Sequence, residues 1–91
     1  MSLKLTIPTA LRKITGNADV VEVQSGTVQE IIEQVDRSYS GFLSRVCEDD
    51  GKLRRFINIY VNGEDIRFLE NLSTSVPDGA ELSIILAIAG G

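Results

Sequence analysis

One long amphipathic segment limits what this chain can fold into. It begins at Thr27 and carries a stripe of apolar residues at helical spacing: Val28, Ile31, Ile32, Val35 and Tyr39. The Thr27 hydroxyl can accept from the backbone of Glu30, and the Glu30 carboxylate can reach back to Thr27, which marks the start of a helix. A helix with such a stripe is stable only when the stripe is buried, so a sheet must supply the opposite surface.

The other apolar residues mostly alternate with polar ones, as in strands that bury one face. We predict five strands, at residues 2–7, 19–24, 56–61, 64–68 and 81–88. The first two are expected to pair antiparallel, and Asn62-Gly63 favours a type I′ hairpin turn between the next two. The last strand is the most apolar and should be central, beside the first. The sequence therefore predicts an α+β fold, the β-grasp (ubiquitin-like) arrangement: a mixed sheet of four to five strands with one main helix packed on one face, in a single domain over residues 1–91.

Composition and charge exclude several kinds of site and partner. The chain has one cysteine and no histidine, so it has no intrachain disulfide, no Ser–His or Cys–His pair and no common zinc site. The net charge of −4, from 13 acidic and 9 basic residues, argues against nucleic acid as a partner. The apolar runs are too short to cross a membrane, and the first residues lack the apolar core of a signal peptide. We therefore expect a cytoplasmic protein with neither nucleic-acid nor membrane contacts.

The single cysteine, Cys47, has two interpretations. It could be a thiol that handles sulfur, or a small, partly buried apolar residue. Its sequence neighbours Glu48 and Asp49 are acidic and would not lower the pKa of a thiol, which favours the second interpretation.

The sequence ends with Ala87-Ile88-Ala89-Gly90-Gly91, directly after the last strand. Glycine has no Cβ, so a backbone ending in Gly90-Gly91 can pass through a narrow channel. Extended, residues 87–91 reach roughly 17 Å, enough to carry the Gly91 carboxylate into another protein's active site. Terminal residues also fray commonly, so the same pattern fits an incidental end. We take residues 87–91 as a functional C-terminal tail.

Several motifs together resemble one known family. They are the β-grasp order, the segment Phe56-Ile57-Asn58-Ile59-Tyr60-Val61-Asn62-Gly63-Glu64-Asp65-Ile66-Arg67, the turn Pro77-Asp78-Gly79 and the terminal Ala89-Gly90-Gly91. The chain is similar to the ubiquitin-like sulfur carrier proteins of the MoaD/ThiS family, and within it to the CysO-type carriers of actinobacterial cysteine biosynthesis. Many MoaD relatives have prolines before the tail, where this chain has Leu86-Ala87-Ile88, which argues more against a molybdopterin role than against a carrier role.

The resemblance implies a carrier that is a substrate and not an enzyme. An ATP-dependent adenylating enzyme would convert the Gly91 carboxylate, beside Gly90, to an acyl-adenylate. A sulfide or persulfide donor would then displace AMP and leave a thiocarboxylate, 1-thioglycine. In CysO-like systems the sulfur passes to a pyridoxal-phosphate cysteine synthase, and a metalloprotease releases cysteine. The resemblance implies no bound cofactor and no metal in the carrier.

A partner-binding surface is also expected. If Ile57, Ile59 and Ile84 face the helix, strand alternation sends a second apolar set to the open face of the sheet. With the start of the tail, this set is Phe56, Tyr60, Ile85, Ala87, Ile88 and Ala89. Alternatively, short helical turns or the segment after Phe68 cover that face. Arg67 could steer a carboxylate or phosphate, or could simply be a solvated charge.

Three other functions remain open from the sequence. The chain could be the small subunit of a molybdopterin synthase, a ubiquitin-like modifier that forms isopeptide bonds with lysines, or a plain β-grasp binding module. The sequence does not identify the sulfur acceptor or the activating enzyme.

Overall fold

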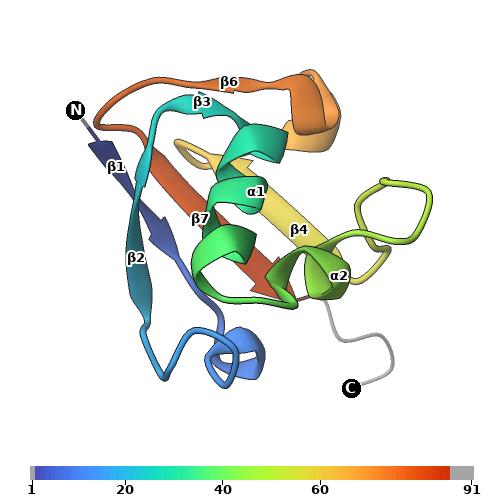
Figure 1. Ribbon diagram of the computed structural model, residues 1–91. Coiled ribbons are helices and arrows are strands. Elements are labelled where there is room, and N and C mark those ends of the chain that lie inside the picture. Colours follow the sequence, from blue (N-terminus) through green and yellow to red (C-terminus); the bar gives the residue numbers. More distant parts are fainter. Residues whose placement is uncertain (1, 87–91) are drawn as a thin grey trace.

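The structure is a computed structural model that describes residues 2–86 (Figure 1). Its elements are, in chain order, β1 (Ser2–Thr6), the 3₁₀ turn η1 (Thr9–Leu11), β2 (Val20–Gln24), β3 (Gly26–Thr27), α1 (Val28–Ser38), α2 (Phe42–Val46), β4 (Ile57–Val61), β5 (Glu64–Asp65), the 3₁₀ turns η2 (Ile66–Phe68) and η3 (Asn71–Ser73), β6 (Ser75–Val76) and β7 (Glu81–Leu86).

Five strands form one mixed sheet in the order β2-β1-β7-β4-β5. The first strand pairs antiparallel with β2 and parallel with β7, while β4 pairs antiparallel with β7. The last strand is therefore central and lies beside the first, as predicted from its apolar sequence. This confirms the β-grasp arrangement with a five-stranded mixed sheet and one main helix.

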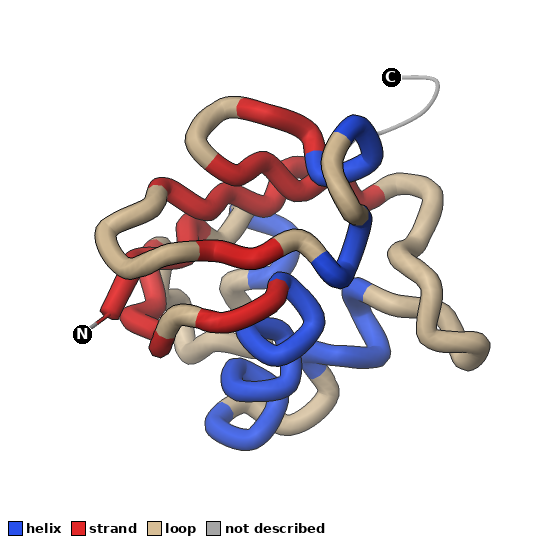
Figure 2. Tube along the Cα trace, turned by 90° about the horizontal axis from the view of Figure 1, so that it is seen from above, coloured by secondary structure: helices blue, strands red, loops and turns tan. Residues whose placement is uncertain are grey.

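The main helix forms where the sequence predicted it. The Thr27 hydroxyl accepts from the backbone N–H of Glu30 (3.1 Å), and the Glu30 carboxylate accepts from the backbone N–H of Thr27 (2.9 Å), so the capping box is complete. Figures 1 and 2 show α1 lying across one face of the sheet. Its apolar stripe is buried there against the inward side chains of the strands: Val28, Ile31, Ile32 and Val35 from the helix, and Leu3, Leu5, Ile57, Ile59, Leu82 and Ile84 from the sheet.

Four strand boundaries within the described residues differ from the prediction. The first strand ends at Thr6 and not at residue 7, and the second begins at Val20 and not at residue 19. The strand predicted at residues 56–61 is β4, which begins at Ile57. Phe56 lies in a turn that is closed by the Ile57 N–H donating to the Arg54 carbonyl (3.0 Å). The returning strand is only Glu64–Asp65 and not 64–68. The Asp65 carboxylate accepts from the backbone N–H of Arg67 (2.8 Å) and starts η2, which turns Ile66 into the core. The hairpin turn itself is confirmed, since Asn62 and Gly63 both have the positive φ (51° and 84°) that type I′ requires.

A short second sheet was not predicted. The strand β6 pairs antiparallel with β3, immediately before the start of α1, and the Val28 N–H donates to the Thr74 carbonyl (3.0 Å). These bonds hold the segment after η3 against the N-terminal end of the helix. Within residues 2–86, no helix has both the length and the apolar character needed to cross a membrane.

Candidate functional site

The predicted site begins where the chain leaves the sheet. The last residue of β7 is Leu86, which lies opposite Ile57, the first residue of β4. The pairing of β7 with β4 continues to this point, whereas the pairing of β7 with β1 ends at Ser83. The tail residues Ala87, Ile88, Ala89, Gly90 and Gly91 lie outside the described residues, so their predicted roles stay predictions. The described part supplies the rigid exit from which they continue.

The open face of the sheet carries apolar side chains close to this exit. Ile85 is 49% exposed, and Phe56, next to Ile57 in sequence, is 51% exposed. Tyr60 is half-buried and lies opposite Ser83 in the β4–β7 pair. Alternation thus directs Tyr60 and Ile85 away from the helix, as expected, whereas Phe56 precedes the strand and takes its direction from a turn. The role of all three in binding a partner is untested.

Arg67 has a defined position at the same end of the sheet. Its Nη2 donates to the Ile57 carbonyl (2.9 Å), and its Nη1 donates to the side-chain oxygen of Asn58. The Asp65 carboxylate lies 3.7 Å from Nη1. The side chain is still 38% exposed. The guanidinium is therefore held along the outer edge of β4, in the place that a longer β5 would occupy, and is not a freely solvated charge.

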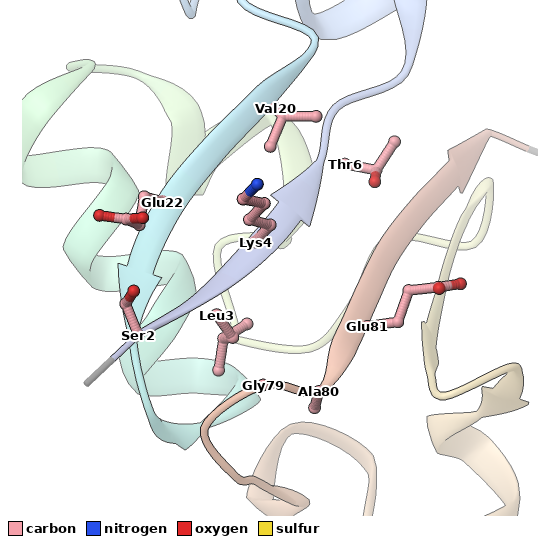
Figure 3. Close-up of a pocket in the computed structure, with 9 residues that line it drawn as sticks. All are labelled: Ser2, Leu3, Lys4, Thr6, Val20, Glu22, Gly79, Ala80 and Glu81. Atoms are coloured by element: carbon pink, nitrogen blue, oxygen red, sulfur yellow. The ribbon is translucent and has the colours of Figure 1, made fainter.

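A shallow concavity of about 480 Å³ lies on the open face at the opposite end of the sheet, where β1 and β7 begin. Figure 3 shows Lys4 of β1 between Glu22 and Glu81, whose carboxylates point away from it. The register agrees, because Lys4 is the cross-strand partner of both glutamates. This end of the open face is polar and of mixed charge, in contrast with the apolar end at the chain exit.

Cys47 is an apolar core residue. Its side chain is 5% exposed and belongs to the core cluster, and burial raises the pKa of its thiol, while the nearby Arg54 lowers that pKa by a smaller amount. A buried thiol with a raised pKa is a poor nucleophile. This agrees with the apolar interpretation of Cys47. Over residues 2–86, no group of three or more His, Cys, Asp or Glu side chains is placed to hold a metal ion.

Sequence reasoning missed two parts of this surface. Asn58 was assigned no role, yet its amide oxygen anchors Arg67. Phe68, at 83% exposed, lies in η2 and not in a strand, so alternation could not place it. The available signal that the strand stops there was Asp65, since an Asp side chain readily accepts from the backbone N–H two residues on.

The chain matches a known protein family along nearly its whole length. The model of the family described as "ThiS family" matches residues 5–91. The sulfur carrier protein CysO of Mycobacterium tuberculosis is 41% identical over 93 aligned positions, which cover all of both chains. The small archaeal modifier protein 3 of Haloferax volcanii is 26% identical, again over all of both chains.

Solved structures agree in fold. A chain of the Amycolatopsis orientalis BexX/CysO complex superimposes with a TM-score of 0.91 at 45% identity, covering 98% of this chain and 99% of that one. The crystal structure of Mycobacterium tuberculosis CysO gives a TM-score of 0.89 at 39% identity, over 94% of this chain and 99% of that one.

Proposed function

Because the chain belongs to the ThiS family and, within it, to the sulfur carriers of the CysO type, we propose that the Gly91 carboxylate is the group that carries the sulfur. The family match supports this most directly, because it extends to residue 91 and so includes Gly90 and Gly91. In this proposal the domain of residues 2–86 is the part that partner enzymes bind, and the tail is the part that reacts.

The proposed chemistry follows from the reactivity of a carboxylate. A carboxylate resists nucleophilic attack because its leaving group would be oxide. A separate adenylating enzyme therefore transfers AMP from ATP to the Gly91 carboxylate and releases pyrophosphate. Sulfide then attacks the acyl carbon and expels AMP. A persulfide attacks in the same way and gives an acyl disulfide, which thiols then reduce to the thiocarboxylate. The product is a thiocarboxylate, whose sulfur is a soft nucleophile attached to a protein, as in other covalent group carriers.

Two features of the described residues suit this task. The tail follows the central strand, and its origin at Leu86 is paired with Ile57 of β4. The open face presents Tyr60 and Ile85, and the turn before β4 presents the half-exposed Phe56. An enzyme that receives the tail would contact these side chains. We propose that this surface, together with Ala87, Ile88 and Ala89, binds the partner. The Amycolatopsis orientalis relative, solved as a BexX/CysO complex, supports binding of a second protein.

The identity of the sulfur acceptor is the most specific part of the proposal. From the resemblance to CysO-type carriers we propose a pyridoxal-phosphate cysteine synthase as acceptor, with a metalloprotease that releases cysteine. Because loading needs ATP, the proposed location is the cytoplasm.

The test is the intact mass of the protein after incubation with ATP, a sulfide donor and an adenylating enzyme. We expect a mass gain equal to the replacement of one oxygen by sulfur, mapped to Gly91. The control is a variant lacking Gly91, which should fold normally and gain no mass. No gain in the wild-type chain, from an enzyme that loads another carrier in parallel, would refute the proposal, as would normal loading of the shortened chain.

A second function is favoured by one comparison. The Haloferax volcanii relative carries the name of a modifier protein, and a conjugating modifier would use the same Gly90-Gly91 end. In that case Gly91 would form isopeptide bonds with lysines of other proteins. Lysine-linked conjugates found by mass spectrometry of cell extract would favour this function, and loading with sulfur in the absence of conjugates would favour the carrier.

A further inference from the structure

The open face of the sheet is electrostatically divided along the strands. At the end where β7 begins, Lys4 lies between Glu22 and Glu81. At the end where β7 stops, the Arg67 guanidinium is held beside Asn58, whose cross-strand partner is Ile85. An enzyme that receives the tail contacts the second end, because the chain leaves the sheet there. An enzyme that receives the tail therefore meets a cationic region at the exit, made of the Arg67 guanidinium together with Arg54 and Arg55, which precede Ile57 in the chain.

From this arrangement we propose that Arg67 is a docking residue that pairs with a carboxylate on the protein that receives the tail. The inference rests on the proposed function and specifies the chemistry of the partner. The Arg67 side chain is already oriented by the Ile57 carbonyl and the Asn58 amide oxygen, so little side-chain entropy remains to be lost on binding. An arginine presents five N–H donors in a rigid fork, and these two bonds leave further donors without a partner among residues 2–86.

The surroundings of Arg67 determine how strongly such a pair acts. Phe56 and Ile85 are each about half exposed beside the positions that anchor the guanidinium. Docking of a partner over these side chains removes water from around the charge, and a desolvated charge pair couples more strongly than one in water. The Asp65 carboxylate already lies 3.7 Å from Nη1, so a partner carboxylate would be the second anion at this guanidinium. Arginine and aromatic residues together are also typical of interface hot spots.

Two anions could pair with Arg67, a carboxylate of the partner protein or the phosphate of the acyl-adenylate, and their distances from Arg67 distinguish them. The phosphate of an acyl-adenylate is attached to Gly91, five residues beyond Leu86. With the tail extended into an active site, that phosphate lies roughly 17 Å beyond the exit. Arg67 is anchored at the exit itself, on the strand partner of Leu86. Its partner is therefore a group on the surface of the enzyme and not the adenylate.

The experiment measures kcat and KM for sulfur loading of the carrier by the adenylating enzyme, at low and at physiological ionic strength. Arg67→Gln keeps hydrogen-bond donors but removes the charge, and we expect it to raise KM about tenfold or more with kcat unchanged. Arg67→Lys keeps the charge without the fork and should give an intermediate KM. The matched control is Lys4→Gln, which removes the same charge from the other end of the same face and should leave KM near the wild-type value.

Ionic strength distinguishes docking from a structural role. Salt should raise KM for the wild-type carrier and have little effect on KM for Arg67→Gln, because only the first has the charge pair to screen. A structural role alone would raise KM equally for Arg67→Gln and Arg67→Lys, with unchanged salt dependence, and would overturn the inference. Wild-type values for Arg67→Gln would also overturn it while leaving the carrier function intact. Failure of the wild-type chain to load would refute both together.

Discussion

Two neighbouring isoleucines give a sharp test of which face of the sheet is covered. Ile84 is 2% exposed and faces α1, whereas Ile85 is 49% exposed on the open face. They have the same side chain and adjacent positions in the same central strand, and both have a cross-strand partner in β4. Replacement of each by alanine therefore changes one variable, the surface that the side chain contacts.

The expected losses follow from burial. Ile84→Ala removes a fully buried side chain and leaves a cavity, which should lower the free energy of unfolding by about 2–4 kcal/mol. Ile85→Ala removes a side chain that already keeps about half of its surface in water and leaves no closed cavity. Its loss should be about 1 kcal/mol, roughly half of the transfer free energy of a buried isoleucine.

Urea unfolding of the two variants measures this difference. The denaturation midpoints should separate while the slopes stay equal, which would attribute the change to stability alone. Sulfur loading should show the opposite order: Ile85→Ala should raise KM for the adenylating enzyme, whereas Ile84→Ala should load normally under conditions where it is folded. Equal stability losses, or a larger loss for Ile85→Ala, would refute the assignment of the two faces.

Three further outcomes test local features. Thr27→Ala removes the capping box with Glu30 and should lower the free energy of unfolding by about 1 kcal/mol, with Thr27→Ser close to wild type, as measured by urea denaturation. Gly63→Ala should cost about 1–2 kcal/mol in the same assay, because φ is +84° there while no atom within 4 Å would meet the added Cβ; no loss would contradict the type I′ turn. Burial raises the pKa of the Cys47 thiol, so the folded state favours the neutral form and loses stability as the pH rises above about 8.5. Unfolding of Cys47→Ala should show a shallower decline between pH 8 and 10, and identical slopes would contradict burial as the cause.

The parts of the fold that were predictable are those where one local pattern has one structural solution. The capping residues Thr27 and Glu30 and the stripe after them determine the helix, since a single periodicity fits them. Asn62-Gly63 determines the hairpin, because few residue pairs accept two positive φ angles. The central place of the last strand followed from its apolar composition, which only a strand with neighbours on both sides can bury.

The parts that were not predictable depend on contacts between distant residues. Polar and apolar residues alternate from Glu64 to Phe68 as they would in a strand. The strand stops early because the Asp65 carboxylate accepts from the backbone N–H of Arg67 and Ile66 is buried in the core. A glycine such as Gly41 is a common stop signal for a helix, but here another residue ends it. The helix ends at Ser38, and Gly41 (φ 98°) precedes α2, where its N–H donates to the Asp36 carboxylate (3.2 Å). For the candidate site, alternation placed Tyr60 and Ile85, but the position of Arg67 depends on the carbonyl of Ile57, ten residues earlier.

The central position of the last strand also has a mechanical consequence. Tension applied beyond Leu86 acts along the axis of β7, which is bonded to β1 on one side and to β4 on the other. Such a force shears many ladder hydrogen bonds simultaneously, whereas a force across an edge strand would open them one at a time. A partner that pulls on the end of this chain therefore acts against the strongest direction of the sheet, and the domain can stay folded under that load.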